Sequence, residues 1–172
     1  LTSLAIGGLV ERADITGKVE GTAKIAYVFQ NPMQSLNPTM RTGAQIAENV
    51  RRARGRIARK ALEARISGLL ESVALSAVTA RKYPCELSGG QQQRVMIAMA
   101  LAAEPDLLIA DEPTTALDVT TQKEVLDLMD CVARENGAAV LLITHNLGLV
   151  AKYSDFVNVM YAGEIVERGP VE

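Results

Sequence analysis

Two short, uninterrupted apolar runs, Leu107–Ala110 and Ala139–Ile143, constrain the fold more than any other feature of this sequence. Each run is too short for a helix and lacks alternating polar positions, which is typical of a strand buried on both faces. Between them, Gln122–Asn136 has a helical pattern that stops at Gly137. Because such strands alternate with a helix, the sequence predicts a parallel α/β sheet.

Weaker patterns complete this outline. Lys24–Gln30 is predicted to be a strand, since its apolar residues alternate, and it leads into a loop punctuated by Asn-Pro pairs. The other expected elements are helices over residues about 43–53, 58–74 and Gln91–Ala103, a helix end over Leu4–Val10, and a terminal hairpin of Val157–Tyr161 with Glu164–Glu167. The stretch 43–80 has helical patterns only, so we expect an all-helical subdomain inserted into a single domain of residues 1–172.

The composition excludes several classes of protein. Aromatic residues make up only 3% of the 172 residues, so the core is expected to be aliphatic. A formal charge of -2 argues against binding of nucleic acid through a basic surface. Cys85 and Cys131 lack the spacing of metal ligands and are expected to be reduced thiols. No run approaches the roughly 20 apolar residues that cross a bilayer, so the chain is not expected to form a pore by itself.

A turn of small residues, Ser88-Gly89-Gly90, stands directly before the helix expected from Gln91. Glycines let backbone N–H groups approach a ligand without interference from Cβ, and the N-terminus of a helix favours an anion. A plain turn with a helix cap is the simpler interpretation. Followed by an acidic strand end at this spacing, the turn favours an anion site instead.

The acidic strand end consists of Asp111 and Glu112, which follow the Leu107–Ala110 run. Neighbouring side chains at a strand end point to opposite sides. Asp111 is therefore suited to Mg²⁺, directly or through water, and Glu112 to a general base that orients an attacking water. The alternative is an ordinary solvated acidic pair.

Three further residues are ambiguous when each is considered alone. His145, the only histidine, follows the second buried run; ligands gather at that end of a parallel strand, and imidazole there can hydrogen-bond a γ-phosphate, although a single histidine is more often structural. The amide of Gln30 can bind Mg²⁺ or water through its oxygen, or belong to an ordinary loop. Asp118 precedes a helix and is equally suited to be its N-cap.

A basic cluster lies in the helical stretch. A solvated helix and turn is the simpler interpretation, and a docking edge for an acidic partner or for lipid headgroups is the alternative. The cluster consists of Arg51, Arg52, Arg54, Arg56, Arg59 and Lys60.

In their order along the chain, these motifs resemble those of an ABC transporter nucleotide-binding domain. The matching motifs are Gln30 for the Q-loop, Leu87–Gln91 for the signature, Leu107–Glu112 for the Walker B strand, Thr115–Asp118 for the D-loop and His145 for the switch histidine. Longer strings are similar to the dipeptide, oligopeptide and nickel importer subfamily, namely Phe29–Pro38, Arg94–Leu101, Ala110–Val119 and Met160–Gly163. The resemblance covers nearly all of residues 25–172.

The resemblance implies a P-loop NTPase-type parallel sheet, incomplete at its N-terminus, that binds ATP and Mg²⁺. Its catalytic residues would be Glu112, His145 and Gln30, and its metal ligands Asp111 and Gln30. The nucleotide would also be contacted by Ser88, Gly89, Gly90, Gln91 and Asp118. The family further implies an ATPase that drives uptake of peptides or related small solutes. Such a subunit pairs head to tail with a second ATPase subunit, lies under membrane permease subunits at the cytoplasmic face of the plasma membrane, and depends on a solute-binding protein, without nucleic acid.

Three departures from the family pattern accompany the resemblance. The sequence contains no GxxxxGK[ST] phosphate loop, and Leu1–Ala5 resembles the helix that follows it. The segment before Gln30 is shorter than in the family, as if a strand near Gly21–Lys24 were missing, and Asn146 stands where the family usually has aspartate. Because the phosphate loop supplies much of the positioning and charge stabilisation in phosphoryl transfer, we expect this chain alone to hydrolyse ATP poorly or not at all.

Two other functions stay open at the level of sequence. One is a soluble ABC-type ATPase of DNA repair, chromosome organisation or translation, although no coiled coil, zinc module or second cassette is visible. The other is a non-catalytic chain that serves only in assembly. The transported solute is not encoded in these motifs; peptide is our first expectation, with nickel and other small solutes next.

Overall fold

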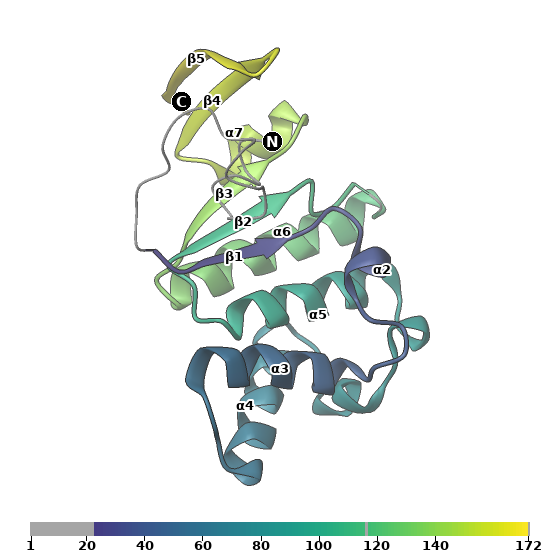
Figure 1. Ribbon diagram of the computed structural model, residues 1–172. Helices are drawn as coiled ribbons and strands as arrows, with labels where there is room; N and C mark the ends of the chain where they lie inside the picture. Colours follow the sequence, from purple (N-terminus) through teal and green to yellow (C-terminus); the bar gives the residue numbers. More distant parts are fainter. Residues whose placement is uncertain (1–22, 116, 172) are drawn as a thin grey trace.

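The computed structural model describes residues 23–115 and 117–171. Its centre is a parallel sheet with the strand order β1-β2-β3 (Figure 1). The strands are β1 (Ile25–Val28), β2 (Leu107–Asp111) and β3 (Ala139–Ile143), and both pairings are parallel. The predicted parallel α/β sheet is therefore confirmed, whereas the helix end expected at Leu4–Val10 lies outside the described residues.

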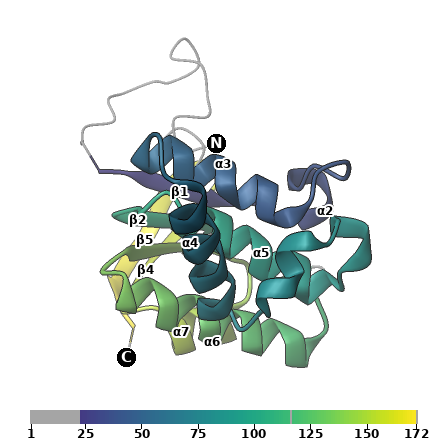
Figure 2. The same cartoon turned by 90° about the horizontal axis from the view of Figure 1, so that it is seen from below.

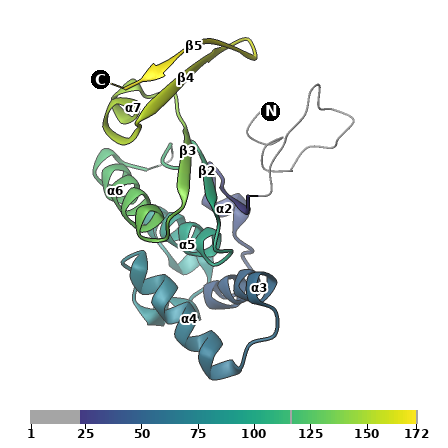
Figure 3. The same ribbon diagram turned by 90° about the vertical axis from the view of Figure 1, so that its left-hand side faces the viewer.

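Two long helices, α5 (Gly89–Leu101) and α6 (Val119–Glu135), lie side by side against one face of this sheet (Figures 1 and 3). Alternate residues of β2, Leu108 and Ala110, are fully buried and join the main aliphatic core with residues of both helices. The remaining fully buried residue of β2, Ile109, faces the other way, as alternation along a strand requires. A strand buried on both faces explains why the Leu107–Ala110 run has no polar position.

Helices α3 (Thr42–Arg54) and α4 (Arg59–Ser72) pack beyond α5, on the side away from the sheet (Figure 2). Two short 3₁₀ turns, η2 (Ala77–Arg81) and η3 (Pro84–Glu86), lead from them back to α5. Residues 42–86 contain helices only, so the expected helices are confirmed. The assignment of this stretch as an inserted subdomain stays a prediction.

The C-terminal part consists of α7 (Leu147–Tyr153) and a hairpin of β4 (Phe156–Tyr161) and β5 (Glu164–Pro170), at the opposite end of the molecule from α3 and α4 (Figures 1 and 3). The hairpin was predicted from sequence and is confirmed as an antiparallel pair. Its turn residues, Ala162 and Gly163, both have positive φ, which matches the twist of a tight hairpin.

The structure differs from the sequence expectations at element ends and in short helices. Helix α5 begins at Gly89 rather than Gln91, and α6 begins at Val119 rather than Gln122, because side chains cap both helices earlier. The loop expected after Gln30 contains one helical turn, α2 (Pro32–Ser35), and α7 was not predicted at all. In the described part of the chain, no helix has the length and apolar character needed to cross a membrane.

Candidate active site

The predicted site residues gather at the carboxyl edge of the sheet. Val28 pairs with Ala110 and Asp111 pairs with Ile143, so the three strands end at nearly the same level. Gln30, Glu112 and His145 each follow their strand by one or two residues and therefore meet at one edge. Because parallel strands that end at the same level bring their carboxyl ends together, residues far apart in the sequence come within hydrogen-bonding distance.

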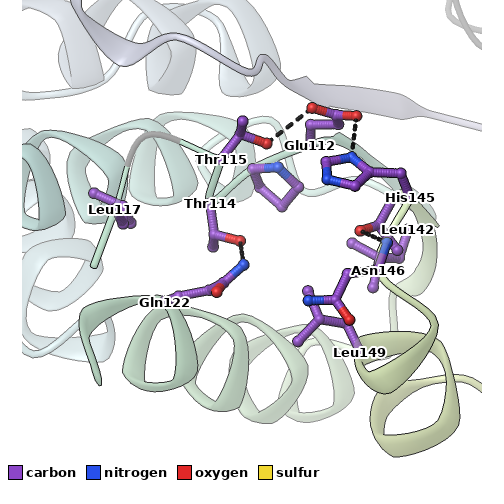
Figure 4. A pocket seen from close by; sticks show the side chains of 11 residues that line it. Glu112, Thr114, Thr115, Leu117, Gln122, Leu142, His145, Asn146 and Leu149 are labelled. Atoms are coloured by element: carbon purple, nitrogen blue, oxygen red, sulfur yellow. Dashed lines mark hydrogen bonds and ion pairs between the residues drawn. The ribbon is translucent and has the colours of Figure 1, made fainter. Parts of the chain in front are cut away.

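The carboxylate of Glu112 is the centre of this site (Figure 4). Its Oε1 lies 2.8 Å from Nδ1 of His145. Its Oε2 accepts hydrogen bonds from Nε2 of Gln30 at 3.0 Å and from Oγ1 of Thr115 at 2.9 Å. The structure thus brings together all three residues predicted to be catalytic, and it adds Thr115, which sequence reasoning had placed only within a motif.

The backbone holds Glu112 in an unusual conformation. Its φ is 45°, in the left-handed region that a non-glycine residue rarely adopts. Its N–H donates to the carbonyl oxygen of Ile143 at 2.9 Å, which continues the pairing with β3, and the N–H of Thr115 donates to its carbonyl oxygen at 3.3 Å. Strained backbone of this kind is found preferentially at functional sites, where surrounding contacts hold it. Here those contacts aim the carboxylate at His145.

Hydrogen bonds lower the pKa of Glu112. The contact with His145 contributes most and the hydroxyl of Thr115 next, while partial burial acts in the opposite direction. The carboxyl is therefore ionised near neutral pH and accepts hydrogen bonds only. Such a group is a weak base but a strong hydrogen-bond acceptor. It can therefore orient a water molecule and take up its proton when the water attacks an electrophile.

An open pocket of about 210 Å³ adjoins this carboxylate (Figure 4). Its wall includes His145, whose side chain is 74% exposed and so remains accessible to a ligand. On the opposite side, Nε2 of Gln122 donates to Oγ1 of the buried Thr114 at 2.8 Å and fixes the segment after Glu112. The pocket is lined mostly by polar groups, which suits a hydrated, charged ligand better than an apolar one.

Asp111 faces a different hollow from Glu112, as expected for neighbours at a strand end. Its Oδ2 accepts a hydrogen bond from the hydroxyl of Tyr27 at 2.6 Å, and both residues line this second hollow with Gln30. Sequence reasoning had used Tyr27 only as part of an alternating strand. Tyr27 pairs with Ile109, so its side chain lies on the same face of the sheet as Asp111, two residues further along β2.

The oxygen ligands available around Asp111 fit a Mg²⁺ ion better than a tightly bound transition metal. No group of three or more histidine, cysteine or acidic side chains is assembled within residues 23–115 and 117–171. Mg²⁺ keeps several waters and needs only one or two carboxylates. One carboxylate, Asp111, beside the amide of Gln30 satisfies that need, so the prediction of these two residues as metal ligands is chemically consistent and stays a prediction.

The N-terminus of α5 forms a separate polar feature. Ser88 caps the helix: its Oγ accepts the N–H of Gln91 at 3.3 Å, and Oε1 of Gln91 accepts the N–H of Ser88 at 3.2 Å. Gly89 and Gly90 occupy the first turn, which contains no acidic residue. First-turn N–H groups have no partner within a helix. Ser88 and Gly89 are exposed, so the predicted anion site is accessible and electrostatically suited to an anion, and no hydrogen bond within the described residues joins it to Glu112 or His145.

Asp118 and Asn146 both act as helix caps. Oδ1 of Asp118 accepts the N–H of Thr121 at 3.0 Å and caps α6, and these contacts lower the pKa of Asp118. The capping interpretation left open for Asp118 is thus realised, and its contact with a nucleotide stays a prediction. Oδ1 of Asn146 accepts the N–H of Gly148 at 2.9 Å and caps α7. An aspartate would make the same contact, so the departure at position 146 preserves the local structure.

The basic cluster lies outside this site, around the end of α3 and the start of α4. Its side chains are exposed, and two of them, Arg54 and Arg59, pair with Glu104 and Glu63. This arrangement fits the simpler interpretation of a solvated helix and turn.

Comparisons with known proteins show the family of this chain. The family model described as ABC transporter matches residues 7–115. The chain is 55% identical over 150 residues to a putative peptide import ATP-binding protein of Brucella melitensis, covering 86% of this chain and 44% of the relative. It is 49% identical over 164 residues to the oligopeptide transport ATP-binding protein OppD of Bacillus subtilis, covering 94% and 44%. The chain thus spans about half the length of the curated relatives it matches.

Solved structures show the same fold. A dimeric ATP-binding cassette bound to ADP and Pi in a post-hydrolysis state has a TM-score of 0.74 and 30% identity, covering 87% of this chain and 63% of that one. The protein cbiO1 of Clostridium perfringens, part of the ABC transporter complex cbiONQ, has a TM-score of 0.76 and 28% identity, covering 86% and 57%. Sequence family and fold therefore agree: the chain belongs to the ABC transporter family, among the ATP-binding proteins of the subfamily that includes its peptide-import relatives.

Proposed function

We propose that this chain is the nucleotide-hydrolysing part of an ABC importer subunit and couples ATP hydrolysis to the uptake of peptides or related small solutes. The observation that carries the proposal is the carboxylate of Glu112, held by Gln30, Thr115 and His145 one residue after Asp111. A water-orienting carboxylate beside a candidate metal ligand is the arrangement that phosphoryl transfer to water requires. The names of the similar import proteins support transport as the purpose of that reaction.

Each residue of the cluster has a distinct task in this proposal. Glu112 orients the attacking water and accepts its proton as the water oxygen bonds to the γ-phosphorus, while the bond from that phosphorus to the β–γ bridging oxygen breaks and ADP leaves. His145, exposed and in contact with Glu112, hydrogen-bonds the γ-phosphate and so links the base to the presence of nucleotide. Asp111 and Gln30 would hold Mg²⁺, which neutralises charge on the phosphate oxygens when bound.

The separation of the helix N-terminus from Glu112 supports a site shared between two subunits. The first turn of α5 offers N–H groups to an anion but has no base, whereas the cluster at Glu112 has a base but no comparable set of N–H groups among the described residues. A head-to-tail pair related by a two-fold axis would bring one feature to the other. The solved relative described as dimeric is consistent with such a pair. Permease subunits and a solute-binding protein would complete the transporter at the cytoplasmic face of the membrane.

The sequence contains no GxxxxGK[ST] loop, so the proposal applies to the protein that carries this chain together with a phosphate-binding loop. The chain alone is expected to hydrolyse ATP poorly or not at all. A magnesium-dependent turnover of the isolated chain that disappears in Glu112→Gln would contradict this expectation.

The test of the proposal is Glu112→Gln in the full-length protein, because glutamine keeps the size of the side chain but cannot accept a proton. We expect ATP turnover to fall by about 10²- to 10⁴-fold, while ATP still promotes association of two subunits. Glu48→Gln is the matched control: Glu48 is exposed on α3, far along the chain from the cluster, and its loss should leave turnover unchanged. Persistent turnover in Glu112→Gln would refute the assignment of the base.

The transport step needs its own measurement. Cells that express the full-length protein with its permease should accumulate a labelled dipeptide, and Glu112→Gln should abolish this uptake. Uptake of nickel instead of peptide would mean that the proposed substrate is wrong, while the proposed hydrolysis mechanism would stand. Association with ribosomes or DNA rather than with membranes would favour a soluble ABC-type ATPase and reject the transport proposal.

A further inference from the structure

The starts of α5 and α6 approach each other so closely that one position has no room for a side chain. A Cβ atom built on Gly90 would lie 2.6 Å from Cγ2 of Thr121, well inside the roughly 3.5–4.0 Å at which carbon atoms pack. A Cβ on the neighbouring Gly89 would meet Cδ2 of Leu117 at 3.3 Å, a tight but tolerable contact. The absence of a side chain at position 90 is therefore required within this chain, independently of any ligand.

Thr121 cannot easily move its methyl group away. Its backbone N–H donates to Oδ1 of Asp118 at 3.0 Å, which holds the residue in the first turn of α6. Because threonine is branched at Cβ, few rotamers are available to it in a helix. The backbone contact and the branched side chain together restrict where the methyl group can lie.

We propose that Thr121 is a positioning residue for the Ser88–Gly90 turn: its methyl group fills the space of a side chain at position 90, so that this turn and the start of α6 move as one unit. The effect of this coupling on ATP turnover rests on the proposed function. The coupling itself rests only on the packing.

This contact connects two polar features between which the described residues form no hydrogen bond. Thr114, two residues after Glu112, accepts hydrogen bonds from the N–H of Leu117 at 3.0 Å and from Nε2 of Gln122 at 2.8 Å. A change at Glu112 would therefore be passed through Thr114 and Gln122 to the start of α6, and through the methyl group of Thr121 to Gly90. The anion-binding N–H groups of α5 would respond to the state of the carboxylate without touching it.

The packing is tested by a double-mutant cycle of Gly90→Ala and Thr121→Ser in the full-length protein. Serine removes only the methyl group and keeps the hydroxyl. We expect Gly90→Ala alone to lower the Tm of this domain by about 2–4 °C. In the Thr121→Ser background the same substitution should leave the Tm unchanged or raise it, because alanine is the better helix former once the overlap is gone. A Gly90→Ala effect that is equal in both backgrounds would overturn the proposed contact.

The positioning role is tested by ATP turnover in the same variants. Gly90→Ala should lower kcat at least tenfold with less than a threefold change in KM, because the turn is expected to act on the phosphate after nucleotide has bound. Adding Thr121→Ser should restore kcat to within about threefold. Thr120→Ser is the matched control: Thr120 is the exposed neighbour on α6 and should not rescue Gly90→Ala.

The outcomes are distinguishable. Restored Tm without restored kcat would mean that Gly90 is needed for close approach of the ligand, and the positioning role of Thr121 would be overturned. Absence of any ATP turnover in the unmodified full-length protein would refute the proposed function, whereas the Tm cycle would still decide whether the two helix starts are coupled.

Discussion

Replacement of Thr115 by valine isolates the one contact of Glu112 that the sequence did not reveal. Valine keeps the shape of threonine but cannot donate to Oε2, which would then be held by Gln30 alone. A hydrogen bond to a charged group contributes about 1.5–3 kcal/mol when it is shielded from water. The side chain of Glu112 is 26% exposed, so water replaces part of the loss and we expect a cost of about 1 kcal/mol.

At roughly 1.4 kcal/mol for each factor of ten in rate, this cost corresponds to about a fivefold lower kcat in the full-length protein. The assay is steady-state ATP turnover as a function of nucleotide concentration. KM should change little, because Thr115 contacts the base and not the nucleotide. Thr115→Ser is the control, since serine retains the hydroxyl, and its kcat should stay within about twofold of the unmodified protein. Equal rates for the valine and serine variants would refute the idea that this hydroxyl holds Glu112 in place.

Three further predictions concern a helix cap, a core residue and a surface ion pair. Ser88→Ala removes the cap of α5 and should lower the free energy of unfolding by about 1 kcal/mol, measured by urea denaturation, whereas Ser88→Asn should keep most of the stability. Leu108→Ala in the fully buried centre of β2 should cost about 2–5 kcal/mol in the same measurement, and a cost below that of Ser88→Ala would contradict the placement of the core. The pKa of Asp127 is lowered chiefly by its hydrogen bond from Lys152. The ionised carboxylate therefore contributes fully to stability above the ordinary carboxyl pKa, and this contribution is lost as pH falls through the lowered pKa. Between about pH 6 and pH 3, the Tm of Asp127→Asn should fall less than that of the unmodified protein.

The sheet was predictable because its signal is local and physical. A strand covered on both faces must be apolar at every position, and Leu107–Ala110 satisfies this rule and is buried in the structure from Leu108 onward. The run Ala139–Ile143 was interpreted in the same way and does form a parallel strand, but its residues are exposed or half-buried, so the prediction of burial on both faces was wrong for β3. Parallel strands joined by helices then bring their carboxyl ends together, so the meeting of Gln30, Glu112 and His145 follows from topology once the strands are known. No side-chain geometry was needed for that step.

Features that depend on contacts across the fold were not predictable in the same way. Helix α7 is only seven residues long, too short to show a periodic pattern, and its cap is an asparagine that sequence reasoning had treated as a departure. In the sequence Tyr27 is one more alternating strand residue; only the register with β2, which pairs it with Ile109, places its side chain on the same face as Asp111. The starts of α5 and α6 were misplaced by two or three residues because capping residues, not apolar periodicity, decide where a helix begins.

Gly90 satisfies two requirements that the sequence alone cannot separate. A glycine at the start of a helix is consistent with close approach of an anion, and the pattern Ser88-Gly89-Gly90 was interpreted in that way. A Cβ atom at the same position would also lie only 2.6 Å from Cγ2 of Thr121, so a side chain would be excluded even in a protein that binds no ligand. These two causes predict opposite results when the methyl group of Thr121 is removed: a packing glycine becomes replaceable, and a ligand glycine does not. The double-mutant cycle therefore separates a structural requirement from a chemical one at a position where a single substitution would report only that glycine matters.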